Sequence, residues 1–166
     1  METAELHKLA AGIELLVLDV DGVLTDGRLR YDADGRESKE FHVRDGYGIQ
    51  QLLANGIHVA VISGRQSPAA AARLAELKVL DVYLGRNDKR PVLEELIARR
   101  RVPLDRVACM GDDVPDLDIM GLAGLGITVA DAHPLVLAAA DWVTKAAGGR
   151  GAVREACDLL LAARSR

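Results

Sequence analysis

The sequence predicts an α/β fold, a three-layer, Rossmann-like parallel sheet with helices on both faces. Apolar runs of strand length alternate along the chain with segments of helical periodicity, which is typical of βαβ units joined by right-handed crossovers. Several of these runs also end abruptly in polar residues. In open parallel sheets, ligands bind in the crevice outside the carboxyl ends of the strands, so these ends are where a site is expected.

The first expected strand is the apolar run 15–18, which leads directly into Asp19 and, two residues later, Asp21. Alternate side chains of an extended segment share a face, so both carboxylates can reach one site. Two neighbouring carboxylates repel unless a cation or a shared proton separates them. Mg²⁺ is the simplest solution, because it takes carboxylate oxygens. An acidic turn is the alternative for this segment alone, since Asp-Gly is a common turn pair.

The remaining elements follow in order. Two short runs, 28–31 and 37–43, flank Asp34 and Gly35, which predicts a β-hairpin after the first strand. Residues 1–12 precede the pattern and are expected to fray. No repeat or linker is visible, so residues 1–166 are expected to form one domain. Helices are expected over 46–55, 68–78, 89–101, 115–122 and 151–164, and strands over 59–62, 82–84, 107–110, 125–129 and 142–143.

Polar groups follow three of the later strands: Ser63 with Gly64, then Lys89, then an acidic cluster at 112–116. If the strands are parallel neighbours, these groups converge on Asp19 and Asp21. Phosphoryl transfer needs this set, because a carboxylate can attack phosphorus while a metal, a lysine and a hydroxyl offset charge on the phosphate oxygens. Each group also has a plain structural explanation, such as a helix cap for Ser63. Lysine is slightly unfavourable at a helix N-terminus, which suggests an anionic partner for Lys89.

The segments 19–25, 63, 89 and 111–116 resemble, in order, the four motifs of the haloacid dehalogenase-like phosphatases. The segments 42–49, 129–134 and 148–155 are similar to a small capless branch of that superfamily, the 3-deoxy-D-manno-octulosonate 8-phosphate (KDO 8-phosphate) phosphatases. The resemblance runs from about residue 13 to the last helix. It implies a magnesium-dependent phosphatase that acts on a sugar acid phosphate through a phospho-aspartate, in lipopolysaccharide precursor synthesis.

The resemblance also implies roles for individual residues. Asp19 is expected to be the nucleophile and Asp21 the general acid. The expected catalytic set is Asp19, Asp21, Ser63 and Lys89. The expected Mg²⁺ ligands are the carboxylates of Asp19 and Asp112 and the backbone carbonyl of Asp21. Asp113 and Asp116 are expected to orient metal-bound waters and Lys89. The expected substrate-binding set is Asp21, His42, Val43, Arg44, Asp45, Gly46, Ser63, Gly64, Arg65, Arg73 and Lys89, with residues 42–46 expected as a loop. The glycine-rich tail with Arg150 and Arg154 is expected to close over a neighbouring active site.

The space between Asp21 and Ser63 is too short for the cap domain that many relatives in this superfamily carry. The resemblance implies that hairpins from four subunits associate instead, so that a neighbour supplies each lid in a homotetramer. A lone two-stranded hairpin is marginal in water, which also favours association. An ordinary surface hairpin is the alternative.

Composition restricts the partners. The net charge of −4 and the absence of a dense basic face argue against nucleic acid, and Arg99, Arg100 and Arg101 are expected to form a solvated helix end. No apolar stretch approaches the roughly 20 residues that span a bilayer, and no secretory signal is evident, so a cytoplasmic location is expected. Cys109 and Cys157 lie in apolar segments and are expected to act as small buried hydrophobes.

Two other functions remain open from the sequence. The same chemistry could act on another sugar acid phosphate, such as a nonulosonate 9-phosphate, because the motifs determine the reaction and not the leaving group. A receiver module that accepts phosphate on an aspartate also combines clustered acids, a hydroxyl and a lysine. Asp21 favours the phosphatase, because it stands where an acid could release a leaving group.

Overall fold

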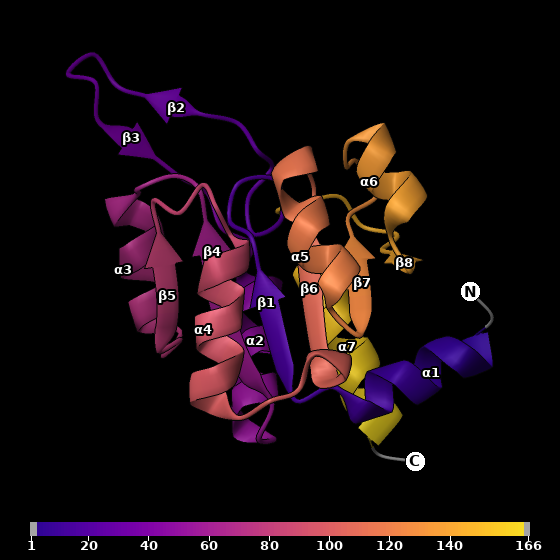
Figure 1. The fold of residues 1–166 in the computed structure, drawn as a ribbon. Helices are drawn as coiled ribbons and strands as arrows, with labels where there is room; N and C mark the ends of the chain where they lie inside the picture. Colours follow the sequence, from indigo (N-terminus) through magenta and orange to yellow (C-terminus); the bar gives the residue numbers. More distant parts are fainter. Residues whose placement is uncertain (1–2, 165–166) are drawn as a thin grey trace.

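The computed structural model describes residues 3–164, and its centre is a six-stranded parallel sheet (Figure 1). The strand order is β5-β4-β1-β6-β7-β8, as expected for a doubly wound fold. In register, Leu18 of β1 lies opposite Val61 of β4 and Met110 of β6. The strands are β1 (Leu15–Leu18), β4 (His58–Ser63), β5 (Asp81–Leu84), β6 (Val107–Gly111), β7 (Leu125–Thr128) and β8 (Trp142–Val143).

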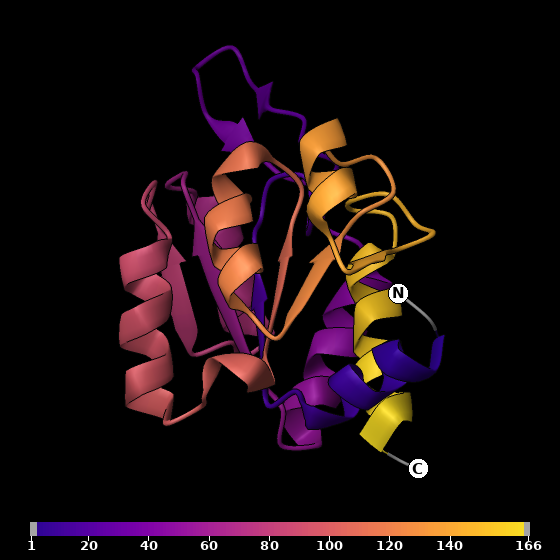
Figure 2. The same cartoon turned by 45° about the vertical axis from the view of Figure 1, so that its right-hand side comes forward.

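Helices cover both faces of this sheet, which confirms the predicted three layers. Figure 1 shows α4 and α5 in front of the sheet and α2 and α7 behind it, and the turned view of Figure 2 shows these two pairs on opposite sides of the strands. All four residues of β1 are fully buried, as a strand covered on both faces requires. The helices are α2 (Val43–Ala54), α3 (Pro68–Glu76), α4 (Arg90–Arg100), α5 (Leu117–Leu122), α6 (Pro134–Ala139) and α7 (Ala152–Arg164), with short 3₁₀ turns η1 (Leu104–Arg106) and η2 (Val114–Asp116).

The expectation that the amino-terminal segment frays is wrong for residues 3–12; Met1 and Glu2 lie outside the described residues. This segment forms α1 (Thr3–Gly12), which packs against α7. Leu6 and Ala10, four residues apart, are buried on its inner face. Packing against α7 therefore stabilises this helix, and the sequence of residues 1–12 alone does not reveal that contact.

The predicted hairpin is present as a separate antiparallel sheet of β2 (Arg30–Tyr31) and β3 (Glu37–Ser38). It projects beyond the carboxyl ends of the parallel strands (Figure 1). Between β1 and β4, the chain contains this hairpin and α2 as its regular elements, so no cap domain is inserted there.

Helix α2 begins at Val43, three residues earlier than predicted, so residues 43–46 are its first turn and not a loop. His42 is the N-cap, and its Nδ1 accepts a hydrogen bond from the Arg44 N–H at 3.2 Å. A histidine is an uncommon cap, and the start was therefore placed too late.

At the end of α4, Arg99 and Arg101 are exposed, as expected for a solvated helix end, but two of the arginines also pair with a buried carboxylate. Arg99 donates to Asp81 Oδ1 at 2.5 Å, and Arg100 Nε donates to Asp81 Oδ2 at 2.8 Å. Asp81, at the start of β5, is buried, so two guanidinium groups compensate its charge. Among residues 3–164, no helix has the length and apolarity required to cross a membrane.

Candidate active site

The candidate site lies where the connections of the sheet change direction. From β1 the chain runs outward through β4 to β5 and then returns to β6 on the other side of β1. Ligands bind at such a switch point, at the carboxyl ends of the strands. A cavity of about 340 Å³ opens there, lined by Asp19, Asp21, Gly27, Ser63, Gly64, Arg65, Asn87, Lys89, Asp112, Asp113, Pro115 and Asp116.

Asp19 is held by the sheet and by a lysine. It directly follows β1, and its backbone N–H donates to the Met110 carbonyl of β6 at 3.0 Å. Lys89 Nζ donates to Asp19 Oδ1 at 2.7 Å and to Asp116 Oδ1 at 2.5 Å, and all three side chains are buried. The structure thus brings together residues that are 70 and 27 positions apart in the chain.

Asp116 is fully engaged by the protein. Its Oδ2 accepts the backbone N–H groups of Asp112 at 3.0 Å and Asp113 at 3.3 Å, while its Oδ1 accepts from Lys89. Asp113 is exposed at the rim and caps η2, accepting the Val114 N–H at 2.8 Å. Both residues therefore shape the turn that carries Asp112, and Asp116 also orients Lys89.

Asp112 has a different environment. Within residues 3–164 no group donates a hydrogen bond to its carboxylate, although it lies beside Asp19 and Asp116. It packs so closely against Gly22 that a Cβ atom there would lie 2.0 Å from Asp112 Oδ2. Gly22 also has a φ of +93°, a conformation that L side chains rarely adopt. Glycine at this position is what allows the approach of Asp112 to the loop after β1.

The cluster concentrates more negative charge than its one lysine neutralises. Burial, together with Asp19, Asp116 and Asp113, raises the pKa of Asp112 to about 8. Burial also raises the pKa of Asp19 to about 6, although Lys89 opposes the shift. Burial alone would lower the pKa of Lys89, but Asp19 and Asp116 outweigh it and the net shift is upward. One carboxylate oxygen from each of Asp19, Asp112 and Asp116 lies within 4.8 Å of the others.

An all-oxygen donor set with excess negative charge fits a hard divalent cation such as Mg²⁺. Asp112, which has no donor of its own within the described chain, and Asp19 are the side chains suited to hold it. Asp116 fits less well, because its oxygens already accept three hydrogen bonds.

The opposite wall of the cavity offers groups for a phosphate. Ser63 ends β4 and is buried, and its hydroxyl makes no hydrogen bond within residues 3–164. Gly64 follows at the lip, with the Asn87 side-chain oxygen 3.0 Å from where its Cβ would be. A hydroxyl and backbone N–H groups beside an ammonium are suited to bind phosphate oxygens.

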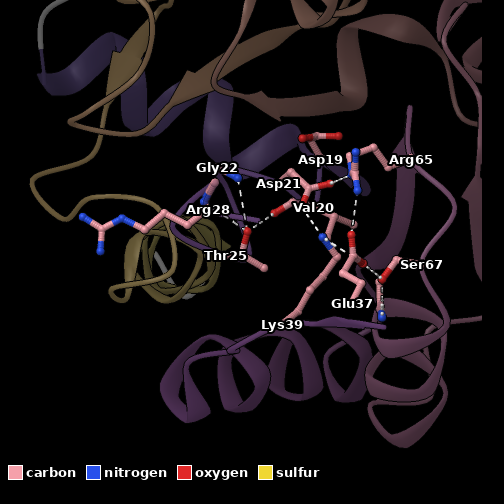
Figure 3. A network of polar contacts seen from close by, with 12 residues as sticks. Asp19, Val20, Asp21, Gly22, Thr25, Arg28, Glu37, Lys39, Arg65 and Ser67 are labelled. Atoms are coloured by element: carbon pink, nitrogen blue, oxygen red, sulfur yellow. Dashed lines mark hydrogen bonds and ion pairs between the residues drawn. The ribbon is translucent and has the colours of Figure 1, made fainter. Parts of the chain in front are cut away.

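Asp21 faces the hairpin. Lys39 Nζ donates to Asp21 Oδ1, and Arg65 Nε lies 3.8 Å from Asp21 Oδ2 (Figure 3). Arg65 also donates to Glu37 at 2.7 Å and to the Tyr31 hydroxyl at 2.9 Å. The predicted substrate-binding arginine is thus at the cavity wall, but in this structure its guanidinium is engaged by the hairpin.

Several predicted substrate-binding residues do not line this cavity. His42, Asp45, Gly46 and Arg73 surround a separate small hollow of about 10 Å³. Arg73 forms an ion pair with Glu76 at 2.8 Å.

The other two predicted contacts in this segment, Val43 and Arg44, are exposed on the first turn of α2. Within this chain, the structure therefore does not bring residues 42–46 or Arg73 to the cavity.

The glycine-rich tail packs against its own chain, and its expected contact with a neighbouring active site stays a prediction. Gly148 and Gly149 pack on the loop after β1 of the same chain, and the Gly149 N–H donates to the Val23 carbonyl at 3.0 Å. Arg154 pairs with Asp158 at 2.7 Å and lies over the Tyr47 ring. Within the described chain, this segment therefore packs against the loop after β1.

Sequence reasoning missed Lys39, Glu37 and Asn87. Asn87 precedes Lys89 by two residues in the loop after β5, and its place at a strand end was the available signal. Lys39 and Glu37 lie in a hairpin of mixed charge, and nothing local distinguishes them from solvated strand residues.

Known proteins are similar to this chain in sequence and in fold. A family described as haloacid dehalogenase-like hydrolase matches residues 75–155. The 3-deoxy-D-manno-octulosonate 8-phosphate phosphatase KdsC of Escherichia coli strain B / BL21-DE3 is 45% identical over 164 residues, covering 99% of this chain and 87% of the relative.

Two solved structures are similar over almost the whole chain. The Yersinia pestis 3-deoxy-D-manno-octulosonate 8-phosphate phosphatase superposes with a TM-score of 0.96 at 45% identity, covering 97% of this chain and 87% of the other. The Moraxella catarrhalis enzyme, solved with magnesium ion, phosphate ion and KDO, has a TM-score of 0.96 at 39% identity. The match covers 99% of this chain and 94% of that enzyme. The chain belongs to the haloacid dehalogenase-like hydrolases, in the family of the 3-deoxy-D-manno-octulosonate 8-phosphate phosphatases.

Proposed function

We propose that this protein is a magnesium-dependent phosphatase that hydrolyses 3-deoxy-D-manno-octulosonate 8-phosphate to 3-deoxy-D-manno-octulosonate and phosphate, in lipopolysaccharide precursor synthesis. The observation that carries the proposal is the Asp19 carboxylate, bound by Lys89 at 2.7 Å in a cavity that Ser63 also lines. The Ser63 hydroxyl makes no hydrogen bond within residues 3–164. The substrate follows from relatives at 45% identity that carry this name.

In the proposed reaction, an Asp19 carboxylate oxygen attacks phosphorus and the bond from phosphorus to the sugar oxygen breaks. Asp21 gives a proton to the departing sugar oxygen, so the sugar leaves as an alcohol. Asp21 then takes a proton from a water molecule, whose oxygen attacks the phosphorus of the phospho-aspartate and releases phosphate and the Asp19 carboxylate. Lys89, Ser63 and the Gly64 N–H hold the phosphate oxygens.

The Asp19 and Asp112 carboxylates and the Asp21 backbone carbonyl are the proposed Mg²⁺ ligands. The ion supplies positive charge where the carboxylate nucleophile and the phosphate, both anionic, must approach each other. Asp113 and Asp116 hold the turn of Asp112 through the hydrogen bonds described above.

We propose that the sugar acid is recognised by Arg65, a cation that lines the cavity with its Nε 3.8 Å from Asp21 Oδ2. Residues 42–46 and Arg73 lie outside the cavity of their own subunit, so their proposed contact with substrate requires a neighbouring subunit. We propose a homotetramer assembled through the hairpin, which exposes Leu29 and Tyr31.

We also propose that residues 1–166 form one domain, since the buried hydrophobic cluster includes both Leu6 and Leu160. A cytoplasmic location is proposed because Cys109 and Cys157 are both free and buried, as is usual in a reducing compartment.

The test is phosphate release from a panel of substrates with and without a chelator. The octulosonate 8-phosphate is expected to give a higher kcat/KM than a nonulosonate 9-phosphate, glucose 6-phosphate or p-nitrophenyl phosphate, and EDTA is expected to abolish release. Asp19→Asn should abolish turnover, while Asp118→Asn, which alters an exposed carboxylate, should not. A higher kcat/KM for the nonulosonate would reassign the substrate. A phospho-Asp19 that persists without release of phosphate from any ester would instead indicate a receiver.

A further inference from the structure

The side chain of Lys39 extends from the hairpin and is buried beside Asp21, which lines the active-site cavity. Only 1% of the side chain is exposed, and its ammonium lies between two carboxylates, Asp21 and Glu37, the latter at 3.4 Å. Figure 3 shows the Lys39 side chain extending from the hairpin to Asp21. A buried ammonium is costly unless it is paired, so both carboxylates are needed to keep it there.

Glu37 connects this lysine to the rigid part of the molecule. Its Oε1 accepts from the Ser67 hydroxyl at 2.7 Å, and its Oε2 accepts from Arg65 at 2.7 Å. Ser67 is itself fixed, because its hydroxyl oxygen caps α3 by accepting the Ala70 N–H at 3.2 Å. The chain of contacts therefore runs from the start of α3 through Glu37 and Lys39 to Asp21.

Nothing else described in the structure fixes the Asp21 carboxylate as directly. The backbone of Asp21 lies in the turn after β1, outside the sheet, and Arg65 lies farther away at 3.8 Å. A proton donor must be held within a fraction of an ångström and about 10–20° of its productive orientation. A carboxylate on a turn needs such support from a neighbouring group.

We propose that Lys39 is a positioning residue for the reaction, which holds the Asp21 carboxylate in the orientation that delivers its proton to the departing sugar oxygen. The inference rests on the proposed function, because it takes Asp21 as the general acid. Lys39 takes no part in the bond changes: the bond from phosphorus to the sugar oxygen breaks, the bond from phosphorus to Asp19 forms, and the transferred proton comes from Asp21. The hairpin thus completes the active site of its own subunit, whatever it contributes to a neighbour.

The test uses the variant Lys39→Met, which keeps the apolar stem and removes the ammonium, with two substrates that differ in leaving group. A sugar alkoxide needs protonation as it leaves, whereas p-nitrophenolate does not. The kcat/KM of each substrate reports the steps up to the departure of its leaving group. We expect Lys39→Met to lower kcat/KM for the octulosonate 8-phosphate by about 10- to 100-fold, less than the roughly 10²–10⁴-fold expected of Asp21→Asn. For p-nitrophenyl phosphate we expect a loss below about threefold.

Lys39→Arg should restore part of the lost rate, because it can still donate to both carboxylates. Arg30→Met is the matched control, since it removes another hairpin cation whose partner, Glu40, lies 2.7 Å away on the exposed side. It should leave both kcat/KM values within about twofold. All variants are compared at equal oligomeric state and Mg²⁺ saturation.

An equal loss on both substrates in Lys39→Met would overturn the inference, because a purely structural lysine affects both leaving groups alike. If Lys39→Met does not fold, Lys39→Gln carries the same comparison. Asp21→Asn distinguishes the two failures: if it shows no dependence on the leaving group, the role proposed for Asp21 is wrong. If it shows that dependence and Lys39→Met does not, the inference on Lys39 alone is wrong.

Discussion

At the scale of single residues, the carboxylates of the site are closer together than their charges favour. The pKa of Asp112 is raised to about 8 and that of Asp19 to about 6, in both cases chiefly by burial. A carboxyl group with a higher pKa in the folded than in the unfolded protein takes up protons on folding between the two values. Stability therefore falls as pH rises across that interval. A bound dication removes this penalty, because it stabilises the ionised form.

We therefore expect the melting temperature of the metal-free protein to fall between about pH 5 and pH 8, and saturating Mg²⁺ to remove most of the decline. The lowered pKa of Glu37 acts below this window and does not affect the trend. Asp112→Asn should reduce the decline of the melting temperature with pH in the metal-free protein. Differential scanning calorimetry with EDTA or Mg²⁺ measures the effect. A metal-free protein that becomes more stable across this window would contradict it.

Gly22 sets the distance between the loop after β1 and Asp112. Gly22→Ala would place a Cβ 2.0 Å from Asp112 Oδ2 at a φ of +93°. We expect loss of Mg²⁺ affinity and of activity, besides a backbone cost of about 1–3 kcal/mol. Gly56→Ala is the control, because it has a φ of +75° with no atom within 4 Å of the new Cβ. Gly56→Ala should lower the free energy of unfolding, measured with urea, and leave the Mg²⁺ affinity, measured by titration, unchanged. Equal Mg²⁺ affinity in the two variants would disprove the packing argument.

The sequence could predict residues whose place follows from the backbone. Asp19, Ser63 and Asp112 stand at the ends of adjacent parallel strands, so the order of the strands brings them together. The partners of Arg65 and Lys39 could not be found this way. They depend on how the hairpin folds back over the sheet, which strand patterns do not encode.

At the scale of elements, the buried strands were predicted well because they are read from continuous apolar runs. The helix ends were predicted less well. α2 starts on a histidine cap, and α1 was missed because its stability comes from packing on α7 at the other end of the chain. Tertiary contacts of this kind outweigh local propensity.

The packing of α1 on α7 predicts that substitutions on its buried face lower the free energy of unfolding more than substitutions on its exposed face. Leu6→Ala should lower the free energy of unfolding by about 2–3 kcal/mol, because Leu6 is buried against the core. Lys8→Ala changes an exposed residue of the same helix and should stay within about 0.5 kcal/mol. Chemical denaturation of both variants measures the difference. If the two variants are equally stable, α1 is not docked as described.

At the scale of the whole molecule, no cap domain covers the active site within residues 3–164. The hairpin stands beyond the sheet with two exposed hydrophobic residues, Leu29 at 48% and Tyr31 at 53%. A two-stranded hairpin is marginally stable alone. Polar contacts join this one to the rest of the chain, from Lys39 to Asp21 and from Glu37 to Arg65. Burial of the exposed hydrophobic residues against other copies would stabilise the ribbon and bring a neighbour's residues toward the cavity.

A tetramer through the hairpin makes a testable prediction. The wild type should sediment with four times the 17.8 kDa mass of one chain, and Leu29→Glu should dissociate it, since a buried, unpaired carboxylate is costly at an interface. Leu80→Glu is the control, because Leu80 is 82% exposed but lies between α3 and β5, away from the hairpin. Dissociation should also lower kcat/KM for the sugar acid phosphate more than for p-nitrophenyl phosphate, because the small ester makes little use of a lid. A monomeric wild type would contradict the tetramer and leave each cavity open to solvent. A tetramer that survives Leu29→Glu but not Leu80→Glu would place the interface away from the hairpin.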